Sequence, residues 1–206
     1  MFKMFVDNLE KVLHNMFITA LREFIRDNET KPKQDGTERE KILNRRLFQK
    51  ISEVTTVGTP LIECPIQPSK NDESSLPREE KKPDITLRLV DYEKREHLDY
   101  HIECKRLDKP QSHYCSSYIT NGVTRFIDPQ CGYGCFCDLG FMIGYIQNLT
   151  FNNVFETVNL YAAGNNIPPL TLINGDSEVS LSTLEHILIR QQKFPRFRLR
   201  HYWAEV

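Results

Sequence analysis

The chain has 206 residues, of which 39% are hydrophobic and 27% charged, the proportions of a soluble globular protein. Its formal net charge of −1 excludes a molecule-wide basic field, so any surface that binds nucleic acid must be local. No apolar stretch is long enough to cross a bilayer, and the N-terminus lacks the pattern of a signal peptide. We therefore expect a cytoplasmic protein with six reduced cysteines and one main domain.

The first predicted element is an amphipathic helix over residues 5–25. Its apolar residues recur at helical spacing, as Phe5, Leu9, Val12, Leu13, Met16, Phe17, Ala20, Leu21, Phe24 and Ile25. A stripe of this kind is typical of a helix that covers a hydrophobic core. Because the stripe is wide and rich in Phe and Met, an interface with another chain is the alternative.

A second helix is predicted from residue 37 to about residue 51. The stretch 27–36 has the composition of a loop, and Thr37 followed by Glu40 forms a capping box. Glu38 and Glu40 both fall in the first turn, where acidic side chains face the positive end of the helix dipole. We divide the chain here, into an N-terminal helix and loop (1–36) and the main domain (37–206).

Two predicted strands then bring three charged residues together. Residues 54–66 form a strand or bent hairpin, and the hydrophilic stretch 68–82 is a loop at the mouth of the site. After Pro83, Asp84 opens a strand with alternating apolar residues. A second alternation sends Glu103 and Lys105 to one face, so two acids and a lysine converge.

Convergent carboxylates of this kind repel one another unless a cation lies between them, and hard oxygen ligands suit Mg²⁺ or Mn²⁺. A lysine beside such a metal can orient water or stabilise charge that develops on a phosphate. These are the requirements of phosphodiester hydrolysis. The alternative is a surface hairpin on which Asp84, Glu103 and Lys105 only increase solubility.

The pattern Pro83-Asp84, followed by Glu103-Cys104-Lys105 after an apolar run, resembles the PD-(D/E)XK nuclease superfamily, which has the restriction-endonuclease-like fold. The resemblance implies that Asp84, Glu103 and the backbone carbonyl of Cys104 bind the metal and that Lys105 is catalytic. It also implies that an acidic residue of the preceding helix reaches the metal. Glu40 matches that placement best, and Glu38 is the competitor.

A third helix is predicted over residues 112–127, with Tyr118, Gly122 and Arg125 on one face. The segment from Tyr118 through Tyr133 to Tyr145 is similar to the part after the catalytic lysine in small restriction-endonuclease-like proteins of bacterial genomes. In a nucleic-acid complex, Arg125 would hold a phosphate and Tyr118 would stack on a base. Alternatively, both side chains dock the helix on the sheet.

The cysteines at 131, 135 and 137 raise the question of a zinc site, with His113 and Cys115 upstream. Their spacing does not give two Cys-x₂-Cys half-sites, so we favour a glycine-rich loop that folds without zinc.

The last part of the chain is predicted to contain a buried strand (141–147), a helix (152–163), a short extended segment (170–173), a helix capped by Ser182 (182–190) and a final strand (194–206). On the final strand Arg196, Arg198 and Arg200 share a face. Three such arginines either follow the phosphates of a nucleic acid or protect an exposed sheet edge.

Taken together, these elements predict an α/β fold with a mixed central sheet flanked by helices. The expected function is that of a Mg²⁺-dependent endonuclease, with DNA as the first candidate substrate and restriction or anti-phage defence as the setting that the resemblance implies. A non-catalytic subunit of this fold, or a toxin-like ribonuclease, is the alternative. Because one such centre cuts one strand, we expect a homodimer or a larger defence complex that forms through residues 5–25.

Overall fold

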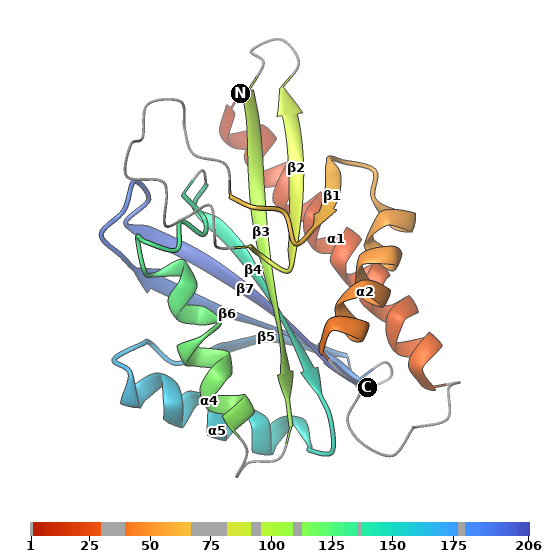
Figure 1. Ribbon diagram of the computed structural model, residues 1–206, viewed down its shortest axis with the longest axis vertical. Helices are drawn as coiled ribbons and strands as arrows, with labels where there is room; N and C mark the ends of the chain where they lie inside the picture. Colours follow the sequence, from red (N-terminus) through yellow and green to blue (C-terminus); the bar gives the residue numbers. More distant parts are fainter. Residues whose placement is uncertain are drawn as a thin grey trace.

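The computed structural model describes residues 2–29, 40–66, 82–91, 96–108, 113–135, 137–176 and 180–206. The strands are β1 (Thr59–Ile62), β2 (Ile85–Asp91), β3 (Glu96–Leu107), β4 (Leu139–Ile146), β5 (Thr171–Asp176), β6 (Leu181–Ile189) and β7 (Arg196–Glu205). They form one sheet in the order β1-β2-β3-β4-β7-β6-β5 (Figure 1). The strands β3, β4 and β7 are parallel, and all other neighbours are antiparallel.

Helices cover both faces of this sheet. They are α1 (Phe2–Glu29), α2 (Glu40–Val54), α4 (His113–Thr120), the short 3₁₀ helix η2 (Val123–Phe126) and α5 (Phe151–Gly164). One hydrophobic cluster joins α1 and α2 to one face, and a second cluster joins α4, η2 and α5 to the other (Figure 1). The predicted class, a mixed sheet flanked by helices, is therefore confirmed.

The alternation along β3 and its parallel neighbour β4 decides which side chains meet which layer. Ile102 and Cys104 of β3 belong to the cluster under α1 and α2. Glu103 and Lys105 point to the opposite face, because successive side chains of a strand alternate. Glu103 is aligned with Met142 of β4, which belongs to the cluster under α4 and α5.

From Leu13 to Ile25, the apolar stripe of α1 is buried inside the chain itself. Phe17 is fully buried, with its ring centroid 4.7 Å from that of Phe141 and 5.4 Å from that of Tyr202. Leu13 and Leu21 are likewise fully buried. From Leu13 to Ile25 the side chains of the stripe already pack on the sheet, so these residues are not available to a dimer interface. The interpretation as a helix that covers the core is the correct one.

Two predicted helices differ from the observed structure. The helix predicted from Ser182 is the strand β6, which pairs with β5 on one side and β7 on the other. The helix predicted over residues 112–127 is divided into α4 and η2 around Gly122. A Cβ atom at Gly122 would lie 2.4 Å from the carbonyl oxygen of Tyr118. Thr37, Glu38 and the polar loop 68–81 lie outside the described residues.

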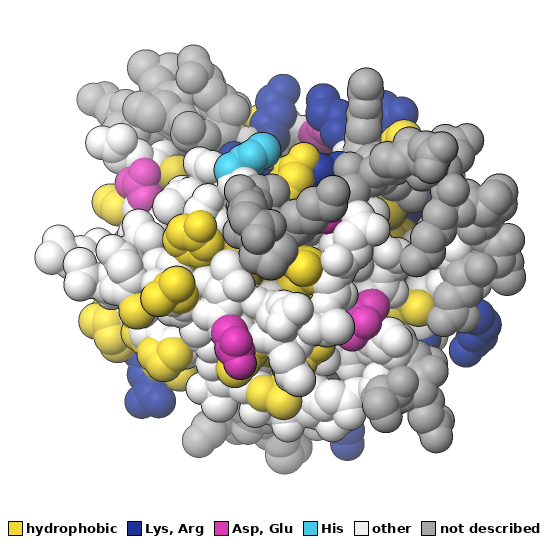
Figure 2. All heavy atoms as spheres, turned by 90° about the horizontal axis from the view of Figure 1, so that it is seen from below, with side chains coloured by type: hydrophobic (Ala, Val, Ile, Leu, Met, Phe, Trp, Pro, Cys, Tyr) yellow, Lys and Arg dark blue, Asp and Glu magenta, His cyan; other side chains and the backbone are white. Residues whose placement is uncertain are grey.

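The exposed hydrophobic side chains are dispersed. The most exposed are Leu160 on α5 and Ile189 at the end of β6, with exposed fractions of 73% and 72%. Figure 2, which views the molecule from below, shows hydrophobic side chains as separate groups among polar ones. Among the described helices, none is long and apolar enough to cross a membrane.

The burial of Phe17 generates a stability prediction. Truncation of a fully buried Phe removes its contacts and leaves a cavity, so Phe17→Ala should lower the free energy of unfolding by about 3–5 kcal/mol. Val12→Ala is the matched control on the same helix; Val12 is 38% exposed, and its truncation should change stability by less than about 0.5–1 kcal/mol. Urea unfolding measures both, and equal losses would contradict the packing of this face of α1.

Candidate functional site

The candidate site lies where β3 extends beyond β2. The first residue of β2, Ile85, is aligned with Ile102, so the part of β3 after Ile102 pairs with β4 alone. On the open side, the amide of Cys104 donates to Asp84 Oδ2 at 2.8 Å, and the amide of Arg106 donates to Glu40 Oε2 at 3.0 Å. Two carboxylates therefore replace the missing strand as acceptors for backbone amides.

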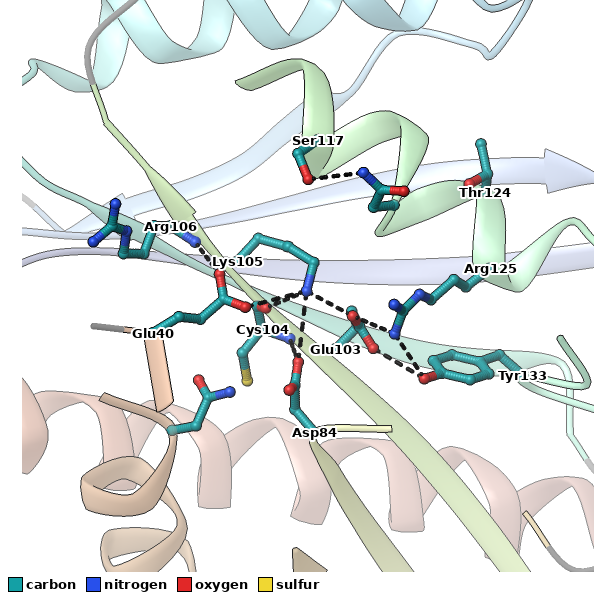
Figure 3. A network of polar contacts seen from close by, with 12 residues as sticks. Glu40, Asp84, Glu103, Cys104, Lys105, Arg106, Ser117, Thr124, Arg125 and Tyr133 are labelled. Carbon is teal, nitrogen blue, oxygen red and sulfur yellow. Dashed lines mark hydrogen bonds and ion pairs between the residues drawn. The ribbon is translucent and has the colours of Figure 1, made fainter. Parts of the chain in front are cut away.

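The ammonium group of Lys105 lies at the centre of the acidic residues (Figure 3). Its Nζ is 2.7 Å from Glu103 Oε1, 3.3 Å from Glu40 Oε1 and 3.8 Å from Asp84 Oδ2. It also donates to the carbonyl oxygen of Cys104 at 2.9 Å. Three carboxylates and one carbonyl, from α2, the start of β2 and β3, therefore converge on one cation.

Glu103 receives further donors from the far side of the site. Arg125 Nη1 donates to Glu103 Oε1 at 2.7 Å, and the Tyr133 hydroxyl donates to Oε2 at 3.1 Å (Figure 3). Glu103 is completely buried, whereas the side chain of Arg125 is 32% exposed. The cluster therefore connects a buried carboxylate to a guanidinium group that solvent or a ligand can reach.

Burial and like charges shift the proton equilibria of the cluster. Burial first, and the charge of Glu103 second, raise the pKa of Asp84 from 3.8 to about 7. Burial alone would lower the pKa of Lys105, but the charges of Glu103, Asp84 and Glu40 outweigh it and raise that pKa. Lys105 therefore stays positively charged at neutral pH, while Asp84 is close to its titration midpoint.

The donor atoms of this cluster suit a hard divalent cation. Carboxylate and carbonyl oxygens are the ligands of Mg²⁺ and Mn²⁺, and Asp84, Glu103, Glu40 and Cys104 supply them. Within the described residues, no three His, Cys, Asp or Glu side chains are spaced as a ready-made metal site. The Lys105 ammonium occupies the point of convergence, so a metal at this point requires that Lys105 Nζ move away.

The structure separates the two residues predicted on the third helix, Tyr118 and Arg125. Tyr118 is fully buried; its hydroxyl is 2.8 Å from His201 Nδ1 and accepts a hydrogen bond from Trp203 Nε1 at 2.8 Å. Base stacking by Tyr118 is therefore excluded, and the alternative that it docks α4 on the sheet is correct. Arg125, from η2, does reach the carboxylate cluster through Glu103.

The three arginines of β7 lie away from the cluster. β7 is a central strand between β4 and β6, so the interpretation of Arg196, Arg198 and Arg200 as guards of a sheet edge is wrong. Arg198 and Arg200 form ion pairs with Glu10 of α1, at 2.7 and 3.0 Å. Both arginines share the α1 face of the sheet, opposite Glu103.

No sequence pattern assigns a role in the site to Tyr133, although its hydroxyl contacts Glu103. Thirty residues separate the two in the chain, and no regular spacing links them. The only sequence signal for this loop is the pair of glycines that flank Tyr133. Both Gly132 and Gly134 have positive φ, a conformation that glycine adopts more readily than other residues. In the same loop, the thiols of Cys131 and Cys137 are within hydrogen-bonding distance of Asp128 Oδ2 and the Leu139 carbonyl, at 3.4 and 2.9 Å.

The chain was compared with protein-family models, curated proteins and solved structures, and none of them matches.

The raised pKa of Asp84 predicts a pH-dependent stability. Between pH 3.8 and about 7, Asp84 keeps its proton in the folded state, whereas it has lost that proton in the unfolded chain. At higher pH Asp84 is ionised in both states, and its buried charge lowers the free energy of unfolding. This loss of stability becomes smaller as the pH falls. Asp84→Asn removes this penalty. With a chelator present, the free energy of unfolding of the variant should exceed that of the wild type by about 2 kcal/mol more at pH 8 than at pH 5.5. Urea unfolding at both pH values is the measurement, and an equal gain at both would contradict the shift.

Proposed function

We propose that this chain is a metal-dependent nuclease of the restriction-endonuclease-like fold, which hydrolyses phosphodiester bonds, first of all in DNA. The observation that carries the proposal is the convergence of Asp84, Glu103, Glu40 and the Cys104 carbonyl on the ammonium of Lys105. This group of residues joins the sequence pattern of Asp84, Glu103 and Lys105 to an acid from the preceding helix. The restriction or anti-phage setting remains an expectation from the resemblance.

Charge balance supports a phosphodiester as the substrate. Three carboxylates face the two cations Lys105 and Arg125, so the fully ionised cluster has a net charge of −1. A bound Mg²⁺ or Mn²⁺, held by Asp84, Glu103, Glu40 and the Cys104 carbonyl, would make this charge +1, polarise a phosphoryl oxygen and lower the pKa of a water. A site of charge +1 is complementary to the single negative charge of a phosphodiester.

The residues of the chain divide the remaining tasks. Asp84 and Glu40 are fixed by the amides of Cys104 and Arg106, so their carboxylates are oriented before any ligand arrives. Lys105 remains protonated and can donate to a phosphate oxygen as negative charge develops. Arg125 is partly exposed, and in this proposal it holds a neighbouring phosphate.

One observation favours a second candidate, a non-catalytic protein of the same fold. Both oxygens of Glu103 already accept or pair with donors, from Lys105 and Arg125 at Oε1 and from Tyr133 at Oε2. A carboxylate satisfied in this way stabilises the fold without any metal. The two functions differ in whether a divalent cation displaces Lys105.

The nuclease proposal is tested by incubating the purified chain with DNA and RNA in parallel, with Mg²⁺, with Mn²⁺ and with a chelator. Metal-dependent cleavage is expected, and Asp84→Ala and Glu103→Ala should each abolish it because they remove ligands. Lys105→Met should slow cleavage by about 10²- to 10³-fold, since one donor to the transition state is lost.

Matched controls separate chemistry from folding. Glu185→Gln removes a carboxylate that pairs with Arg200 on the opposite face, and Lys50→Met removes a lysine that pairs with Asp27. Both should cut at the wild-type rate. Cleavage by Asp84→Ala at the wild-type rate would reject the site, and no cleavage of either nucleic acid by the wild type would favour the non-catalytic protein.

A further inference from the structure

A strap of chain, defined here as residues 127–135, follows η2 and brings Tyr133 to the carboxylate cluster (Figure 3). The Tyr133 ring is fully buried and packs edge-on against Phe126, with centroids 5.3 Å apart. Its hydroxyl donates to Glu103 Oε2 and accepts a hydrogen bond from Arg125 Nη1, each at 3.1 Å. The orientation of the Glu103 carboxylate therefore depends on where the strap holds this hydroxyl.

Arg190, which follows β6, binds the strap through its backbone carbonyls. A guanidinium group has five N–H donors in a fixed plane, and in Arg190 each of them is matched by a carbonyl oxygen. Nη1 donates to Phe126 and Tyr133, Nη2 to Gly134 and Cys137, and Nε to Phe194, over distances of 2.7–3.3 Å. One side chain thus ties the C-terminal end of the strap, and the residues Phe126 and Cys137 that flank it, to the turn between β6 and β7.

The buried charge of Arg190 favours the observed conformation of the strap over others. Arg190 is 4% exposed, and among the described residues no carboxylate lies within ion-pair distance of it. A buried cation without hydrogen bonds is costly, so any strap conformation that withdraws these carbonyls is disfavoured. The guanidinium also stacks on the ring of Phe197, 3.7 Å from the centroid.

Gly134 allows the strap to approach this closely. Its φ of +65° is one that other residues rarely adopt, and a Cβ atom would lie 2.5 Å from Phe197 Cε2 and 3.1 Å from Arg190 Nη1. Its amide donates to His101 Nδ1 on β3 at 3.2 Å. The strap is therefore held against β3 on one side and against Arg190 on the other.

We propose that Arg190 and Tyr133 are positioning residues for Glu103: Arg190 fixes the strap, and the Tyr133 hydroxyl on that strap fixes the carboxylate. The inference rests on the proposed function, in which Glu103 is a metal ligand. A carboxylate held in one orientation loses less conformational freedom when it binds a cation. Residues that hydrogen-bond to a metal ligand commonly contribute 10- to 100-fold to metal affinity.

The first test concerns Tyr133. Tyr133→Phe removes only the hydroxyl, and it should weaken Mn²⁺ binding by about 10- to 100-fold, as measured by electron paramagnetic resonance of free Mn²⁺. Tyr202→Phe is the matched control, because its hydroxyl bonds to His14 on the opposite face of the sheet. Unchanged affinity in Tyr133→Phe, or an equal loss in both variants, would overturn the proposal.

The second test concerns Arg190. Arg190→Lys keeps the charge but cannot satisfy five carbonyls, so amide hydrogen exchange in peptides over residues 127–135 should accelerate and Mn²⁺ affinity should fall. Arg22→Lys, at an exposed pair with Asp176, is the control. Faster exchange in the strap with unchanged Mn²⁺ affinity would overturn the link from Arg190 to Glu103. If Arg190→Lys does not fold, Gly134→Ala applies the same test from the other side of the contact.

Failure of the proposed function has a different signature. If the wild type binds no Mn²⁺, the metal assignment fails, and crystal structures of the wild type and Tyr133→Phe then decide the positioning role. Rotation of the Glu103 carboxylate away from position 133 in the variant would support it, and an unmoved carboxylate would overturn it.

Discussion

The structure of the site depends on a mismatch in length between two paired strands. β3 continues after Ile102, while β2 has only begun at Ile85, so the amides of Cys104 and Arg106 meet no neighbouring strand. A backbone amide withheld from both water and a partner costs about 1–3 kcal/mol, and Asp84 and Glu40 remove that cost. Because the acids are drawn in to satisfy the backbone, they are crowded against Glu103. That crowding holds Lys105 at their centre. Burial first, and the charge of Glu103 second, raise the pKa of Asp84.

The strand that carries Glu103 and Lys105, and the strand that begins directly after Asp84, could be predicted from the sequence because of the alternation of their residues. The convergence of Glu40 on the same point followed from the resemblance and agrees with the observed geometry. Local patterns could not predict that the loop carrying Tyr133 reaches the site, or that Arg190 binds this loop. Their contacts join residues 30 and 57 positions apart, and such pairs leave no periodic trace in a sequence.

The errors have a common physical cause, which is tertiary context. Ser182 and Glu185 have the spacing of a helix cap, yet β6 is a strand because β5 and β7 pair with both of its edges. Leu184 and Leu188 are both buried, so helical and extended patterns could not be distinguished. The edge alternative for the arginines of β7 failed for the same reason: alternation reveals that a strand has a charged face, but not whether that strand is central.

The position of β7 in the sheet also has a consequence for biosynthesis. β7 follows every other strand in the chain, yet it lies between β4 and β6, so the β5–β6 hairpin has no place to attach until residues 196–205 have emerged from the ribosome. Until then β4 presents an unpaired edge, and the cluster under α4 and α5 lacks Phe197, Leu199 and Trp203. Formation of the native sheet is therefore a late, long-range event, and exposed strand edges of this kind are prone to aggregation until it is complete.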